Sequence, residues 1–203
     1  MDTYLYEMDG TVYLNITNEC SNRCEFCIRH NRGDLRGYDL WLSKKPTFAD
    51  LKAAIDAYSE PYDEAVFCGY GEPTFNMQAL VETGKYLKSL GKHVRLNTNG
   101  QGRLINDRDI VPELVGAIDE VSVSLNEAER IAYLQICHPR FGMLTHDEVV
   151  DFAKSCVAAG ITTRFSVVDT IPNESIRRCR KIAESIGVPL LVRRRITNNA
   201  TYD

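Results

Sequence analysis

Short apolar segments alternate six times with amphipathic segments along this chain, and no other feature restricts its fold as much. The apolar segments are rich in β-branched residues and mostly continuous, which predicts strands that are covered on both faces. The predicted strands are residues 12–17, 65–68, 94–97, 121–125, 163–168 and 189–192. The amphipathic segments predict helices at residues 47–59, 77–90, 107–118, 127–136, 145–159 and 173–186.

Six strand–helix units predict an α/β fold with parallel strands and right-handed connections. A complete eight-unit barrel typically needs about 250 residues, whereas this chain has 203. We therefore predict a six-unit partial (β/α) barrel that forms a single domain over residues 1–203. A doubly wound open sheet is the alternative, and in both folds ligands bind beyond the carboxyl ends of the strands. Asp9-Gly10, between residues 4–6 and 11–16, predicts a small N-terminal hairpin.

The composition excludes several classes of protein. A balance of 24 Lys and Arg against 28 Asp and Glu gives a formal charge of -4, which offers no broad attraction to nucleic acid. No apolar run reaches membrane-spanning length, and the first ten residues lack the basic and apolar build of a secretory signal. Seven cysteines, an odd number, fit a disulfide framework poorly. We therefore expect a cytoplasmic protein whose clustered thiols serve a metal or catalysis.

Three of the cysteines, Cys20, Cys24 and Cys27, follow the first predicted strand. Spacings of four and three residues let three thiolates hold one face of an iron–sulfur cubane from a single loop. A [4Fe–4S] cluster normally takes four thiolates, so a set of three leaves one iron open to another ligand. The competing interpretation is a structural zinc loop in a non-enzymatic binding or interaction module. Zinc needs a fourth ligand, and His30 is close enough in sequence to be considered.

Polar or glycine-rich turns follow the next three predicted strands as well. They read Cys-Gly-Tyr-Gly-Glu-Pro at 68–73, Asn-Thr-Asn-Gly at 97–100, and Ser-Leu-Asn at 124–126. Glycine allows a ligand to approach the backbone closely, although such turns are also common in any α/β protein. Four ligand-like clusters at four successive strand ends favour a shared binding site over chance.

The spacing Cys20-x3-Cys24-x2-Cys27, with the aromatic Phe26 and the string Gly71-Glu72-Pro73, resembles the radical S-adenosylmethionine (SAM) superfamily over essentially the whole chain. The longer strings at residues 66–73 and 96–100 resemble the small TatD-associated radical SAM proteins. The resemblance implies an enzyme that binds a [4Fe–4S] cluster and SAM. Such an enzyme cleaves SAM reductively to a 5′-deoxyadenosyl radical, which abstracts hydrogen from a substrate that the sequence does not identify.

The resemblance also implies roles for individual residues. Cys20, Cys24 and Cys27 ligate iron, and Phe26 lies beside the adenine. The remaining SAM contacts are Gly71 and Glu72 at the methionine amino group, Asn97 and Ser124 at the ribose or carboxylate, and Val168 at the adenine. Arg193, Arg194 and Arg195 are candidates for the SAM carboxylate or a substrate anion, or form a solvated edge.

The other cysteines are interpreted as structural. Cys156 and Cys179 fall on apolar helix stripes, Cys137 ends a helical turn, and Cys68 lies in a strand near the proposed site. His93 and His146 are interpreted as ordinary surface histidines.

The irregular stretch at residues 28–46 carries the substrate candidates Arg29 and His30, followed by Arg32 and Arg36. The alternative substrate region lies around His138 and Arg140. The expected partners are an electron donor such as flavodoxin or ferredoxin and a substrate that is either a small molecule or a protein.

Overall fold

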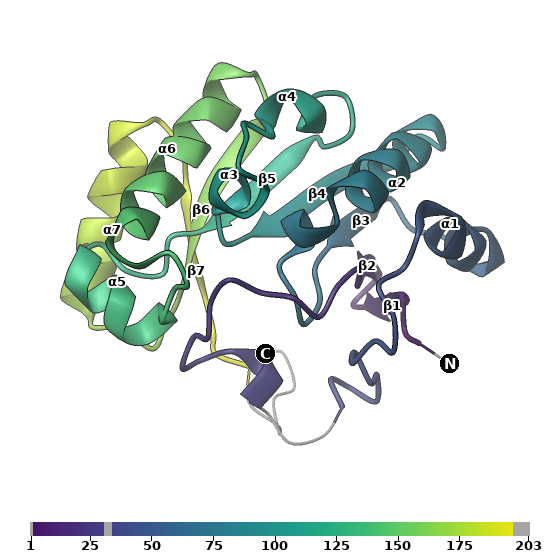
Figure 1. Cartoon of the computed structure of the whole chain (residues 1–203), viewed down its shortest axis with the longest axis horizontal. Coiled ribbons are helices and arrows are strands. Elements are labelled where there is room, and N and C mark those ends of the chain that lie inside the picture. The colour runs from purple at the N-terminus through teal and green to yellow at the C-terminus, as the bar shows by residue number, and fades with distance from the viewer. Residues whose placement is uncertain (1, 31–33, 197–203) are drawn as a thin grey trace.

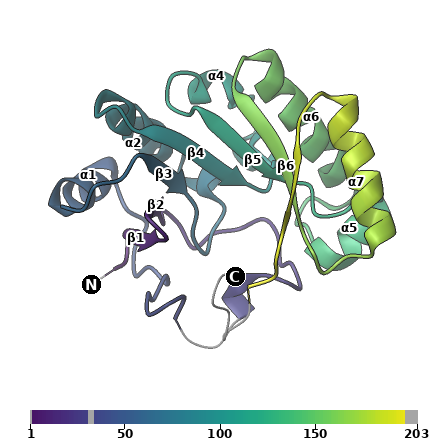
Figure 2. The ribbon, with the colours of Figure 1, turned by 180° about the vertical axis from the view of Figure 1, so that it is seen from behind.

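The computed structural model describes residues 2–30 and 34–196, in which seven strands form one sheet (Figures 1 and 2). The strands lie side by side in the order in which they occur along the chain. They are β1 (Leu5–Met8), β2 (Thr11–Leu14), β3 (Glu64–Phe67), β4 (His93–Thr98), β5 (Glu120–Ser124), β6 (Thr162–Val168) and β7 (Leu190–Arg193). β1 pairs antiparallel with β2, and all later neighbours are parallel.

This strand order decides between the two predicted topologies. A doubly wound sheet reverses its order at a switch point, whereas here the order runs from β1 to β7 without reversal. The sheet does not close, because β1 and β7 are both edge strands. The prediction of a six-unit partial barrel with a leading hairpin is therefore confirmed.

The hairpin turn has the backbone that its sequence predicts. Asp9 has φ 54° and Gly10 has φ 78°. Two central residues with positive φ define the turn that matches the twist of a two-residue hairpin. Glycine takes this conformation without strain, and aspartate is among the few other residues that tolerate it.

The helices cover one side of the sheet (Figure 1). They are α1 (Phe48–Ala57), α2 (Met77–Ser89), α3 (Gly102–Asn106), α4 (Val111–Leu114), α5 (Arg130–Cys137), α6 (Thr145–Ala158) and α7 (Asn173–Ser185). Three short 3-10 turns are η1 (Ile28–His30), η2 (Pro73–Asn76) and η3 (Gly142–Leu144). No helix in residues 2–30 and 34–196 is long and apolar enough to span a bilayer.

One predicted helix is wrong. Residues 107–118 were expected to form a continuous helix, but α3 ends before Asp107, which adopts a left-handed backbone with φ 52°. The following turn leads into α4, where Pro112 occupies the first turn and its missing N–H costs nothing. The chain therefore covers this part of the sheet with two short helices.

The two faces of the sheet differ in chemistry because side chains alternate along each strand. On β4, Val94 and Leu96 are fully buried in the hydrophobic core against the helices. Arg95 and Asn97 alternate with them along the strand and point to the opposite face. The face away from the helices is therefore polar, and the segment between β2 and α1, which carries the cysteines, passes on that side (Figures 1 and 2).

Candidate functional site

The cysteine loop leaves β2 at the carboxyl end of the sheet and is held by backbone hydrogen bonds to the end of α5. The Arg23 N–H donates to the Cys137 carbonyl at 3.0 Å, and the Glu25 N–H donates to the Ile136 carbonyl at 2.9 Å. In return, the Arg140 N–H donates to the Ser21 carbonyl at 2.7 Å. Residues more than a hundred positions away in sequence therefore fix the shape of this loop.

The three predicted metal ligands lie near one another on this loop. The Cys27 N–H donates to the Cys24 carbonyl at 3.1 Å, which closes the turn that leads into η1. Burial raises the pKa of Cys20 to about 12, and the negative charges of Glu72, Cys24 and Cys27 add to that rise. Thiols that oppose one another's ionisation in this way are stabilised as thiolates by a bound metal. Three half-exposed thiols on a pinned loop fit a cluster that takes three protein ligands.

Cys24 also contacts a fourth thiol. A hydrogen bond with Cys137, followed by burial, raises the pKa of Cys24. Cys137 is fully buried in the hydrophobic core, as a structural cysteine should be, and its sulfur accepts from the Asn126 amide at 3.6 Å. No local sequence pattern indicates that this residue lies beside a predicted cluster ligand.

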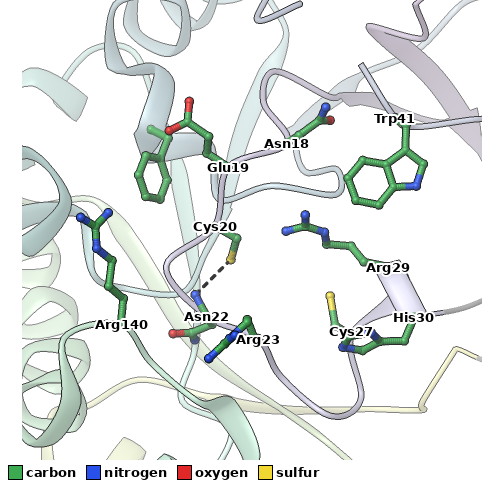
Figure 3. A pocket seen from close by; sticks show the side chains of 11 residues that line it. Asn18, Glu19, Cys20, Asn22, Arg23, Cys27, Arg29, His30, Trp41 and Arg140 are labelled. Atoms are coloured by element: carbon green, nitrogen blue, oxygen red, sulfur yellow. Dashed lines mark hydrogen bonds between the residues drawn. The ribbon is translucent and has the colours of Figure 1, made fainter. Parts of the chain in front are cut away.

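Cys20 and Cys27 line a hollow of about 540 Å³ (Figure 3). Its wall also carries Arg23, Arg29, His30 and Arg140, together with the indole of Trp41. The substrate candidates Arg29 and His30 thus border the hollow, whereas Arg32 lies outside the described residues. Arg36 instead forms an ion pair with Asp9 at 2.9 Å. The His30 Nε2 lies 3.1 Å from the Cys24 carbonyl, so this ring is engaged with the loop backbone.

Glu72 is buried and already has four donors within the protein. One carboxylate oxygen accepts from the Thr74 N–H and hydroxyl and from the Thr98 hydroxyl, the last at 2.7 Å. The other accepts from the Asn99 N–H at 2.6 Å. Burial raises the pKa of Glu72, and these hydrogen bonds lower it. The carboxylate therefore ties the end of β3 to the end of β4.

The two glycines of the 68–73 turn allow the cysteine loop itself to come close. A Cβ on Gly71 would collide with the carbonyl oxygen of Thr17, and one on Gly69 would collide with the side chain of Asn15. The Glu72 N–H donates to the Glu19 carbonyl at 2.7 Å. The sequence predicted that a ligand would lie close to these glycines. In the structure the Thr17 backbone and the Asn15 side chain lie there.

The remaining predicted SAM contacts gather at the same end of the sheet. Asn97, Ser124 and Val168 lie near the carboxyl ends of β4, β5 and β6. Asn97 is paired in register with Ser122, and Ser124 with Ser166, so these polar side chains share the face away from the helices. Phe26 is half-buried and packs against the main core.

Only the first arginine of the triplet lies within a strand. Arg193 ends β7 and is half-buried, whereas Arg194 and Arg195 are exposed. The Arg195 N–H donates to the Asp169 carboxylate at 2.9 Å.

A buried polar network that sequence reasoning missed supports the loop from below. The Asn99 amide donates to the Ser21 hydroxyl at 2.9 Å, and the Gln101 amide donates to Asn22 at 2.7 Å. Both amides follow β4. Asn99 lies within the Asn-Thr-Asn-Gly string at residues 97–100, and Gln101 comes directly after it. Periodicity carries no signal for such pairs, because their partners lie almost eighty residues away.

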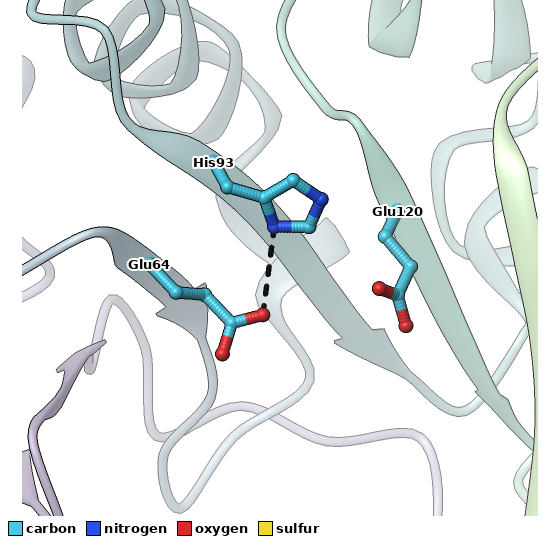
Figure 4. A group of neighbouring side chains, drawn as sticks. All are labelled: Glu64, His93 and Glu120. Atoms are coloured by element: carbon cyan, nitrogen blue, oxygen red, sulfur yellow. Dashed lines mark ion pairs between the residues drawn. The ribbon is translucent and has the colours of Figure 1, made fainter.

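A second group of metal-type ligands lies at the other end of the strands. Atoms of Glu64, His93 and Glu120 lie within 4.8 Å of one another (Figure 4). Both carboxylates already hold guanidinium groups, since Arg95 donates twice to Glu64 at 3.0 Å and Arg164 lies 2.9 Å from Glu120. Each carboxylate therefore already has a guanidinium partner, and ion pairs account for the acidic side chains at this end of the sheet.

Comparison with known families decides the class. Residues 14–186 match the family model described as the radical SAM superfamily. The chain belongs to the radical SAM superfamily. Membership brings with it the two cofactors expected from the sequence, SAM and a [4Fe–4S] cluster, and Cys20, Cys24 and Cys27 are the residues that fit the cluster. No curated protein matches the sequence.

Several solved structures share the fold. Streptococcus suis SuiB bound to S-adenosylmethionine is 19% identical with a TM-score of 0.64, over 94% of this chain and 40% of SuiB. The protein anSMEcpe with bound AdoMet is 16% identical with a TM-score of 0.63, over 91% of this chain and 50% of anSMEcpe. A radical SAM methyltransferase from Sphaerobacter thermophilus is 14% identical with a TM-score of 0.52, over 94% of this chain and 68% of the methyltransferase. This chain therefore spans half or less of the length of SuiB and of anSMEcpe.

Proposed function

We propose that this protein is a radical SAM enzyme that cleaves SAM reductively and uses the resulting 5′-deoxyadenosyl radical to abstract hydrogen from a substrate. The observation that carries the proposal is the pinned loop with Cys20, Cys24 and Cys27 at the carboxyl ends of the parallel strands, within the family match. A [4Fe–4S] cluster held by these cysteines would supply the electron for SAM cleavage, and the expected partner that restores it is an electron donor such as flavodoxin or ferredoxin. The finer resemblance, to the small TatD-associated proteins, belongs to the same proposal.

Different residues of the chain bind different parts of SAM. Gly71 and Glu72 shape the turn that meets the methionine amino group, with Glu72 acting through the backbone of the β3 and β4 ends. Asn97 and Ser124 bind the ribose or carboxylate, and Phe26 and Val168 bound the adenine. Their arrangement on adjacent strand ends supports this assignment.

The substrate side of the site is assigned to Arg29 and His30, which border the hollow next to Cys27. The substrate is either a small molecule or a protein. The structure of anSMEcpe with bound AdoMet and the Kp18Cys peptide, which is 14% identical with a TM-score of 0.65, supports a peptide as one class to test.

Metal content and product formation test this function. Protein reconstituted without oxygen should bind about four irons, as one cubane requires, and should release 5′-deoxyadenosine from SAM when reduced. Cys20→Ala, Cys24→Ala and Cys27→Ala should each abolish both. Cys156→Ala and Cys179→Ala, which alter fully buried helix positions, should keep the iron. Stoichiometric zinc without iron–sulfur absorption would favour the zinc-binding module instead.

A further inference from the structure

Three arginines, Arg23, Arg29 and Arg140, border the hollow. Among the described residues, no carboxylate forms an ion pair with Arg23, Arg29 or Arg140. Most other described arginines have one, including Arg36, Arg95, Arg103, Arg108, Arg130, Arg164, Arg177 and Arg178. An arginine cluster without acidic partners is therefore unusual in this protein.

Two carboxylates of the cysteine loop have partners of their own. Glu19 lies on its wall and forms an ion pair with Lys45, while Glu25 lies 3.4 Å from the ring of His138. The hollow thus keeps the positive charge of its three guanidinium groups, although the whole chain is acidic with a formal charge of -4.

The backbones that carry these arginines are fixed. Arg23 and Arg140 are held by the hydrogen bonds that join the cysteine loop to the end of α5. The Arg29 guanidinium lies over Trp41, 4.8 Å from the ring centroid, and Trp41 packs edge-on against Tyr70 at 5.1 Å. Figure 3 shows Arg140 and Arg29 on opposite sides of the hollow with Cys20 between them, and Arg23 on the cysteine loop below Cys20.

We infer that this hollow binds an anionic group, a carboxylate or a phosphate, of the molecule on which the radical acts. Like charges around one cavity repel one another until an anion enters, and the guanidinium fork matches both groups through paired hydrogen bonds. This inference rests on the proposed function and deepens it by naming a substrate class.

The anion is assigned to the substrate because the predicted SAM residues do not border this hollow. Asn97, Ser124 and Val168 are absent from its lining, which is formed by the cysteine loop, its flanking turns and the segment after α5. The cluster ligands Cys20 and Cys27 form part of that lining, so an anion held here lies next to the reactive centre.

Trp41 provides a direct probe, because it is the only tryptophan of the chain and carries Arg29 on its face. Cluster-loaded protein is titrated with inorganic phosphate and, separately, with succinate, at an ionic strength held constant with chloride so that screening does not change. We expect a saturable change in Trp41 fluorescence with at least one anion. Whether phosphate or succinate saturates the fluorescence change identifies whether the site prefers a phosphate or a carboxylate.

Matched variants locate the binding. Arg23→Ala and Arg140→Ala should raise the midpoint at least tenfold, and Arg29→Lys should weaken binding less than Arg29→Ala. Arg180→Ala, an exposed arginine on α7 away from the hollow, should leave the midpoint unchanged. Iron content is measured for every variant to verify that the loop is intact.

Two results would overturn the inference. One is that neither phosphate nor succinate gives a saturable fluorescence change. A third titration with long polyglutamate belongs to this case, because binding of polyglutamate alone would indicate an acidic macromolecule. The other is an equal shift of the midpoint in Arg180→Ala and in the hollow variants. Deoxyadenosine release, measured on the wild type in parallel, separates this inference from the proposed function. Release without anion binding rejects the anion site alone, and anion binding without release rejects the radical chemistry alone.

Discussion

Glu72 illustrates how a residue that looks like a ligand contact can act through the backbone. Its carboxylate is buried and accepts from donors on η2 and on the end of β4. Its own N–H donates to Glu19 of the cysteine loop. This residue therefore joins three of the segments that surround the proposed SAM site, two through its carboxylate and one through its N–H.

Replacing Glu72 should lower stability and SAM affinity together. Glu72→Ala leaves several buried donors without an acceptor, and each such group costs about 1–3 kcal/mol. We expect the free energy of unfolding to fall by at least about 2 kcal/mol and SAM binding to weaken as the strand ends separate. Urea unfolding and calorimetry with SAM measure the two effects. Glu113→Ala, at an exposed ion pair with Arg108, serves as the control. Weaker SAM binding at unchanged stability would show instead that Glu72 contacts SAM directly.

The contact between Cys24 and Cys137 predicts that metal-free protein forms a disulfide slowly, because the raised pKa of Cys24 keeps its thiol protonated. Oxidised glutathione should accept two electrons from the two thiols, which form a disulfide and lose their protons. Because this disulfide removes one cluster ligand, oxidised protein should take up little iron until it is reduced. Peptide mapping should find the Cys24–Cys137 bond.

Cys137→Ser should protect iron uptake from this treatment, whereas Cys179→Ser, at another fully buried cysteine, should not. Equal loss of iron uptake in wild type and Cys137→Ser would refute the prediction.

At the scale of single elements, α1 begins with a complete capping box. The Thr47 hydroxyl accepts from the Asp50 N–H at 3.3 Å, and the Asp50 carboxylate accepts from the Thr47 N–H at 2.9 Å. Thr47→Ala should lower the free energy of unfolding by about 1 kcal/mol, measured by urea unfolding. Ser43→Ala, outside the helix, is a control for loss of a nearby hydroxyl.

The same box predicts a pH dependence. The backbone hydrogen bond from Thr47, the largest cause, lowers the pKa of Asp50 to about 2. Because the folded-state pKa lies below the ordinary value of 3.8, the stabilisation is fully present above pH 4 and is lost as the pH falls towards 2. Asp50→Asn should flatten this part of the stability profile; an unchanged acid limb would show that other carboxylates dominate it.

The ion pair between β3 and β4 offers a double-variant test. Arg95 donates to both oxygens of Glu64, and its side chain is only 14% exposed. Arg95→Met should destabilise the fold by about 2 kcal/mol, less than for a fully buried pair because Glu64 keeps some contact with water. Glu64→Leu combined with Arg95→Met should recover most of that loss in urea unfolding. No recovery would mean that Arg95 stabilises the sheet mainly through other neighbours such as Tyr13.

For the molecule as a whole, features encoded in local sequence were predicted and features made by distant contacts were not. The strand–helix alternation predicted six parallel strands, and Asp9-Gly10 predicted the hairpin turn, because both depend on neighbouring residues. The break at Asp107 was missed because nothing in the local pattern marks a left-handed residue there. The Cys137 contact and the placement of Arg23 were missed, and Arg140 was expected only in a region separate from Arg29, because tertiary contacts across the chain bring these residues together.

The hydrogen bonds between the cysteine loop and residues 136–140 have a consequence for biosynthesis. Cys27 leaves the ribosome more than a hundred residues ahead of the backbone that holds its loop in shape. A nascent chain therefore displays three cysteines on an unsupported segment throughout the translation of β3, β4 and β5. Iron can be received in the native geometry only after α5 has emerged and docked, so maturation of this protein is a late step in synthesis.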